Sequence, residues 1–164
     1  MSRYHSYLNT ATLILKEYEG KEPLAAFLKK YFARDKKYGS ADRRQIIHLC
    51  YCYYRLGKAF PQMETEKRIL LGLYMCSQEP TPILEHLKPL WNTDKIRLPL
   101  ATKLAGINLI TELKTNWTIE SIFPWVEHLS TGIDIENFVL SHFHQPDLFL
   151  RIRSGKQVLV KRNL

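Results

Sequence analysis

Basic residues that could bind phosphate groups are concentrated in one short part of the sequence. A predicted helix that opens at Pro23, together with the loop after it, carries five of them, and two arginines begin the next predicted helix. We expect the two groups to be neighbours in space, because the connection between them is short. Clustered lysines and arginines are typical of proteins that bind a phosphate backbone. The candidate residues are Lys29, Lys30, Arg34, Lys36, Lys37, Arg43 and Arg44.

Three aromatic residues are interleaved with these cations. Aromatic rings beside cations can stack on unpaired bases of RNA, so they would give such a surface a second kind of contact. The spacing of Tyr31 and Phe32 favours core packing instead, because both follow the apolar stripe of the predicted helix. Tyr38 lies in the loop and is therefore the candidate for base stacking.

A second basic segment follows Pro146, near the C-terminus. Apolar and basic residues alternate in DLFLRIR, a Ser-Gly pair follows, and three apolar residues come after it, which predicts a β-hairpin. Phe149, Arg151 and Arg153 would share one strand face and could contact RNA, although arginines on an edge strand also deter aggregation. The candidate RNA-binding residues of this segment are Arg151, Arg153, Lys156, Lys161 and Arg162.

The charge of the whole chain follows the same division. Residues 1–58 hold 12 lysines and arginines against 5 acids, a net charge of +7. Residues 59–145 hold 7 against 10, a net of −3, and residues 146–164 hold 5 against 1, a net of +4. A segregated positive field attracts polyanions, of which nucleic acids are the first candidates. The alternative is a solvated surface whose charges are merely uneven.

Helices must position the first basic cluster, because helical periodicity dominates the first part of the chain. The apolar residues from Tyr4 to Tyr18 recur every three or four positions, and Gly20 is the expected cap of that helix. Ser40 is the expected N-cap of the third helix, with Asp42 in its first turn. The third helix ends near residue 57 and is apolar on more than one face, which predicts a central position.

The rest of the first 145 residues predicts shorter helices. A fourth apolar helix covers EKRILLGLYMCSQ, and prolines separate the helical segments that follow it. Thr118 is the expected cap of a helix in TIESIFPWVEHLS, and a last helix ends at Pro146. We therefore predict one all-α domain over residues 1–145. Residues 146–164 would be a short β-hairpin that opens a further domain, because two strands are only marginally stable by themselves.

Composition places the chain among globular proteins. Of its 164 residues 45% are hydrophobic, no apolar run approaches a membrane span, and polar residues interrupt the N-terminal segment, so neither a membrane segment nor a signal peptide is expected. The cysteines Cys50, Cys52 and Cys76 lie in apolar helical runs, which favours buried thiols in a reducing compartment. These features predict a soluble cytoplasmic protein.

Several kinds of catalytic site are not recognisable in the sequence. The seven glycines include no GxG pair, so a Gly-rich phosphate loop is missing, and no Cys-x-x-Cys is present. His142, His144 and Asp147 could be drawn as a metal site, but histidines two positions apart diverge on a helix. Cationic side chains at a helix end explain the two histidines more simply. We therefore predict no catalytic residue and no metal site in this chain.

Three segments together resemble a known family. LAAFLKKYF, YGSADRRQIIHLCYCYYRLGKA and the later QPDLFLRIR resemble the N-terminal NusB-like domain of Sun/Nop-type RNA (cytosine-5) methyltransferases, such as the bacterial enzyme that modifies small-subunit ribosomal RNA. The matching features are the Asp-Arg start of the third helix, its aromatic pair with Arg55, and the Pro-x-Leu-x-Leu-Arg pattern after Pro146. Residues 60–140 match only in helical character.

The resemblance implies a NusB-like helical bundle that binds ribosomal RNA, followed by the start of an RNA-binding subdomain. The family's catalytic core binds S-adenosylmethionine and uses cysteines in Thr-Cys and Pro-Cys motifs, which are missing here. This chain would therefore be the RNA-binding N-terminal part of an enzyme for rRNA processing, not an enzyme by itself. Its expected partners are ribosomal RNA and its own downstream catalytic domain, and it would hold no cofactor.

Two other functions remain open from the sequence. One is a free-standing NusB-like factor for transcription antitermination or ribosome assembly, which would act through a protein partner. The predicted C-terminal hairpin argues against it, because a complete helical domain does not need one. The other is a helical interaction module whose basic ends are incidental.

Overall fold

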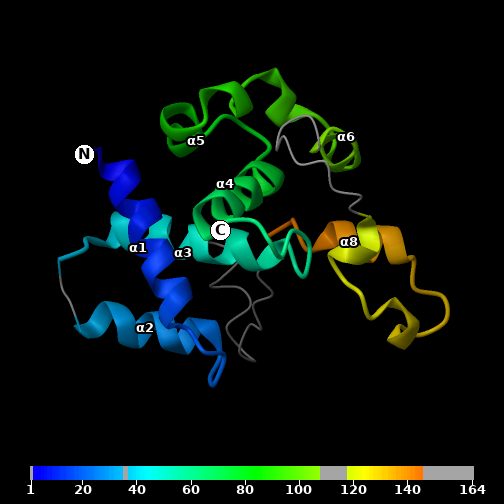
Figure 1. Ribbon diagram of the computed structural model, residues 1–164, viewed down its shortest axis with the longest axis horizontal. Coiled ribbons are helices and arrows are strands. Elements are labelled where there is room, and N and C mark those ends of the chain that lie inside the picture. Colours follow the sequence, from blue (N-terminus) through cyan, green and yellow to red (C-terminus); the bar gives the residue numbers. More distant parts are fainter. Residues whose placement is uncertain (1, 35–36, 108–117, 146–164) are drawn as a thin grey trace, which may run out of the picture.

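The regular structure of the described residues is entirely helical, which confirms the all-α prediction. The computed structural model describes residues 2–34, 37–107 and 118–145 (Figure 1). The hairpin predicted for residues 146–164 lies outside these ranges. Four longer helices come first: α1 (Arg3–Glu17), α2 (Leu24–Arg34), α3 (Ser40–Arg55) and α4 (Thr65–Cys76). None of the described helices is both long enough and apolar enough to cross a membrane.

The second half of the described chain consists of short helical pieces. Prolines interrupt the pattern there, as expected for residues that cannot continue a helix. One predicted helix, in TIESIFPWVEHLS, was wrong: Pro124 separates two single 3₁₀ turns at that place. Thr118, the expected cap, directly precedes the first of these turns, and its backbone N–H donates to Ser121 Oγ at 3.1 Å. The pieces are α5 (Pro82–Leu87), η1 (Pro89–Trp91), η2 (Asp94–Arg97), α6 (Leu100–Ala105), η3 (Ile119–Ser121), η4 (Val126–His128) and α8 (Ile135–Ser141).

The ends of α1, α2 and α3 differ from the predicted ones by one to three residues. α1 ends at Glu17, and Gly20 turns the chain three residues later with a φ of +74°. Pro23 precedes α2, where its carbonyl accepts hydrogen bonds from the first turn. Gly39, not Ser40, takes the N-cap position of α3, because Asp42 reaches back to accept the Gly39 N–H at 3.1 Å.

α3 is central, as predicted, and packs against both α1 and α4 (Figure 1). α4 is buried more completely, since every residue from Arg68 to Met75 is buried. The two helices approach closely at Gly72, where an added Cβ would overlap the carbonyl of Cys52. α3 is not enclosed on all sides, because Tyr51 and Tyr54 on it are exposed.

Contacts at the C-terminal end of α3 attach the later pieces to the longer helices. Gly57 has a φ of +56°, and a Cβ on it would overlap the Ile122 carbonyl, which accepts the Lys58 N–H at 3.0 Å. Arg55 donates to Gln145 Oε1 at 2.8 Å, so the end of the described chain also lies against α3.

Candidate nucleic-acid interface

The predicted cations of α2 lie on its exposed side. Phe27, Leu28 and Phe32 are buried, so the amphipathic helix directs its lysines and Arg34 away from the core. Lys30 Nζ forms an ion pair with Glu22 at 2.8 Å, and Arg34 Nη1 one with Glu17 at 2.6 Å. The sequence analysis missed these pairs, although Glu17 and Glu22 lie beside the loop that returns the chain to α2.

Arg43 connects α3 to α2 and is not a free surface cation. Its Nε donates to the Tyr38 carbonyl at 2.9 Å, and its guanidinium lies over the ring of Phe32, 5.9 Å from the centroid. The Arg43 side chain is therefore half-buried. Arg44, one residue further, is exposed on a different side of α3. The structure thus separates two neighbouring arginines that the sequence analysis had treated alike.

Tyr38 is held by packing contacts within the fold. Its hydroxyl is 2.9 Å from the Thr10 hydroxyl on α1, and its ring meets Phe32 edge to face at 5.7 Å. Lys37 Nζ lies over the same ring, 5.0 Å from its centroid. These contacts support a structural role for Tyr38 and leave less of its ring available to a base. Phe32 is buried and Tyr31 half-buried, in agreement with the predicted core role.

The structure therefore places the candidate residues in different situations. Lys29 and Arg44 are exposed, and within the described part of the chain neither forms an ion pair. Lys30 and Arg34 are exposed and paired, while Arg43 is half-buried. Several candidates lie outside the described residues: Lys36, Arg151, Arg153, Lys156, Lys161 and Arg162.

Two cations of the acidic middle segment are buried, which the sequence analysis also missed. The Arg68 guanidinium donates to the backbone carbonyls of Gly57, Ala59 and Phe60. Its Nη2 lies 2.6 Å from the Gly57 oxygen, and its Nη1 lies 3.1 Å from the Phe60 oxygen. Lys103 Nζ donates to the carbonyls of Tyr74 and Ser77 at the end of α4. Burial lowers the pKa of both side chains.

These two buried cations are not accessible to a ligand at the surface. Residues 59–145 have 7 lysines and arginines against 10 acids, and two of those seven, Arg68 and Lys103, are buried. A phosphate group could therefore not contact either of them directly. The exposed cations of α2 and α3 are accessible to such a group.

The cysteines are free thiols. Cys50 and Cys52 are buried and Cys76 is half-buried, which agrees with their predicted positions. Burial raises the pKa of Cys50 to about 12. A hydrogen bond joins Cys52 to Cys76 and, together with the nearby Arg55, lowers the pKa of Cys76. Within the described ranges, no three histidine, cysteine, aspartate or glutamate side chains gather into a group that could hold a metal ion.

His142 and His144 follow α8 directly. His142 Nδ1 lies 3.0 Å from the Phe138 carbonyl and 3.2 Å from the Val139 carbonyl, at the C-terminal end of that helix. This contact fits the predicted role of a polar side chain at a helix end. Asp147, the third member of the drawn metal set, lies outside the described residues.

Comparison with protein-family models, with curated proteins and with solved structures finds no match to this chain.

Proposed function

We propose that this chain is an RNA-binding helical domain that positions ribosomal RNA for an S-adenosylmethionine-dependent (cytosine-5) methyltransferase. The observation that carries the proposal is the surplus of exposed cations on α2 and α3. Lys29 and Arg44 supply it without ion pairs to other described residues. Such a surface attracts the phosphate backbone and gives binding that weakens as salt rises.

The paired cations of α2 also remain available to RNA. The side chains of Lys30 and Arg34 are 65% and 61% exposed, so their pairs with Glu22 and Glu17 are solvated. Exposed ion pairs contribute only about 0.2–1 kcal/mol. A phosphate group can therefore replace the carboxylate at little cost in free energy.

Methyl transfer itself would belong to a separate catalytic domain, as in the family that the sequence resembles. The seven glycines form no GxG pair, and the described residues include no strand that could present a nucleotide-binding loop. The residues in the described ranges do not form a site that fits S-adenosylmethionine. The domain's own contribution would be affinity for RNA and its orientation. Assignment to the methyltransferase rests on the family resemblance.

The proposal predicts that reversing the charge of Lys29 and Arg44 weakens RNA binding. Binding of a small-subunit ribosomal RNA hairpin by the Lys29→Glu/Arg44→Glu variant should fall at least tenfold at about 0.1 M salt. The slope of log K against log salt should become shallower by roughly 1.4 to 1.8 if two phosphate contacts are lost. Fluorescence anisotropy over a salt series measures both quantities.

The matched control is Lys67→Glu/Lys95→Glu, which makes the same change of charge on exposed residues of the acidic segment. Its affinity should stay within about twofold of the wild type. An equal loss in both variants would show a response to net charge alone. An unchanged affinity of the first variant would contradict the proposed surface, and a protein partner captured without RNA would favour the antitermination or assembly factor.

A further inference from the structure

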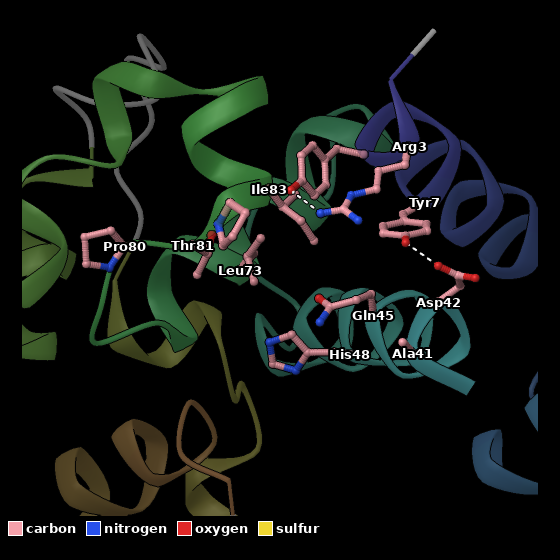
Figure 2. Close-up of a pocket in the computed structure, with 12 residues that line it drawn as sticks. Arg3, Tyr7, Ala41, Asp42, Gln45, His48, Leu73, Pro80, Thr81 and Ile83 are labelled. Carbon is pink, nitrogen blue, oxygen red and sulfur yellow. Dashed lines mark hydrogen bonds between the residues drawn. The ribbon is translucent and has the colours of Figure 1, made fainter. Parts of the chain in front are cut away.

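A pocket of about 450 Å³ lies between the start of α1, the first half of α3 and the connection from α4 to α5. Its volume is within the range of small-molecule sites, roughly 300–1,000 Å³, and it exceeds the space that one nucleobase needs. Figure 2 shows Arg3 and Gln45 reaching into this space from α1 and from α3. None of the candidate residues from the sequence analysis lines it.

The walls of the pocket combine apolar surface with aromatic rings. Leu73 and Ile83 are buried and close one side (Figure 2). Tyr4 and Tyr7 form another side, with their rings edge to face at 6.2 Å. The Tyr7 hydroxyl donates to Asp42, which fixes that ring. A flat heterocycle would find rigid rings and aliphatic side chains on which to pack, as unpaired bases do in RNA-binding proteins.

The polar groups of the pocket suit the edge of a base. Gln45 carries an amide donor and an amide acceptor, the pair that reads nucleobase edges, and its side chain bonds to no other described residue. His48 lies one turn further along α3. Desolvation and the charge of Arg55 lower the pKa of His48. Its Nε2 lies 3.6 Å from Cys52 Sγ, so Nδ1 is the nitrogen left for a ligand. Asp42 is occupied by Tyr7 and by the Gly39 N–H.

Cations flank the pocket on both helices. Arg3 lines it from α1, is exposed, and donates to the Tyr4 hydroxyl at 3.0 Å. Arg44 lies three positions after Ala41 and four positions before His48, and both of these residues line the pocket. Residues at this spacing share one face of a helix, so Arg44 lies on the side of α3 that borders the pocket. Neither arginine forms an ion pair within the described part of the chain. A nucleotide whose base entered the pocket would therefore have a cation near its phosphate on either side.

We propose that this pocket receives one unstacked nucleobase of the bound RNA, between the tyrosines of α1 and the Gln45–His48 face of α3. The inference rests on the proposed RNA-binding function and adds a site of base recognition to it. The cations of α2 and α3 then hold the phosphate backbone, while the pocket selects a single-stranded segment over a continuous duplex.

The test fills the pocket without changing a charge. Ala41 is exposed and lines the pocket, whereas Ser40 is an exposed neighbour that does not. Ala41→Trp should weaken binding of an RNA hairpin with a single-stranded loop roughly 5- to 150-fold, the range that the loss of one stacked base produces. Ser40→Trp should bind like the wild type. Gln45→Ala, which only removes the amide, should weaken binding in the same direction.

An abasic scan of the loop identifies the inserted base. With the wild-type protein, removal of the base at one loop position should lower the affinity for the RNA. With Ala41→Trp, the intact RNA and this abasic RNA should bind equally well, because the pocket is already filled. Circular dichroism checks that each variant is folded. Competition with a free nucleoside monophosphate distinguishes a base held within RNA from a free nucleotide, which should compete only weakly.

The binding measurements can overturn the pocket inference without overturning the proposed RNA-binding function. If Ala41→Trp and Gln45→Ala bind as the wild type while Lys29→Glu/Arg44→Glu does not, the pocket inference is overturned and RNA binding stands. A free nucleotide that binds as tightly as the hairpin would overturn the assignment to RNA. Loss of binding in every protein, the wild type included, would overturn both.

Discussion

At the scale of single residues, two buried cations organise the backbone without facing solvent. Arg68 on α4 donates hydrogen bonds to backbone carbonyls that follow the end of α3. Lys103 on α6 donates to carbonyls at the end of α4. Helix C-termini leave carbonyls without intrahelical partners, so a cation there satisfies them and also opposes the helix dipole. The Arg68 guanidinium also lies 4.9 Å from the centre of the Tyr53 ring.

Arg68→Met should therefore destabilise the fold strongly. The change keeps an apolar stem but leaves buried carbonyls without donors, and hydrogen bonds to a charged group contribute about 1.5–3 kcal/mol each. We expect a loss of about 3 kcal/mol in the free energy of unfolding, measured by denaturant titration. Lys67→Met removes an exposed cation next to it and should change stability by less than about 0.5 kcal/mol. Equal effects of the two changes would refute this role of Arg68.

At the scale of elements, the contact between α3 and α4 depends on a glycine, which has no Cβ atom. Gly72 lies against the backbone of Cys52, so the two helices approach more closely there than a Cβ would permit. Glycine costs a helix about 1 kcal/mol relative to alanine, and the close packing of α4 offsets this cost. Because α4 is the most buried of the longer helices, this crossing determines how the core closes.

Gly72→Ala should destabilise the protein in spite of the better helix propensity of alanine. The new methyl group would meet a backbone carbonyl, which cannot rotate away, so α3 and α4 would have to separate. Overpacking of this kind costs about 1–3 kcal/mol, and we expect the upper end of that range in thermal or denaturant unfolding.

Gly106→Ala is the matched control, because its Cβ would be in ordinary contact at 3.6 Å from the Thr102 carbonyl. This variant should be neutral or slightly more stable than the wild type. If Gly72→Ala were as stable as Gly106→Ala, the close approach of the two helices would not be needed for the fold.

The four longer helices could be predicted from sequence because their apolar residues repeat over ten or more positions. The predicted start of α3 was displaced by one residue, since Ser40 is a good cap by type but Asp42 closes the turn on Gly39 instead. The predicted helix around Pro124 was wrong, because that residue limits the segment to single 3₁₀ turns held by the contact of Ile122 with the end of α3. Local patterns do not report such contacts.

At the scale of the whole molecule, the charge is divided between a basic first part and an acidic middle part. Arg68 and Lys103 of the middle part are buried and cannot contact a phosphate group directly. The pairs of Glu17 and Glu22 with α2 reduce this division of charge locally, although these pairs are exposed and can exchange with phosphate. We expect RNA to approach on the side of α2 and α3 for this reason.

Removing residues 146–164 tests the predicted domain boundary. If residues 1–145 form the folding unit, the shortened chain should unfold within about 2 °C of the full chain, because a loss of about 1 kcal/mol would already lower the unfolding temperature by about 2–4 °C. Its affinity for RNA should still fall, since the deleted segment carries 5 cations. Calorimetry and anisotropy measure the two effects, and a large fall in the unfolding temperature would place the segment within the helical domain.

The sequence by itself determined the helical class, the positions of the longer helices and the segregation of charge. These properties depend on residue type and on spacing along the chain, which periodicity and composition report directly. The tertiary structure alone decided which cations are available. It paired Lys30 and Arg34 with Glu22 and Glu17, placed Arg43 against Phe32, and brought Arg3 and Gln45 to one pocket. Such contacts join residues of different helices and loops, so the periodicity within one helix does not report them.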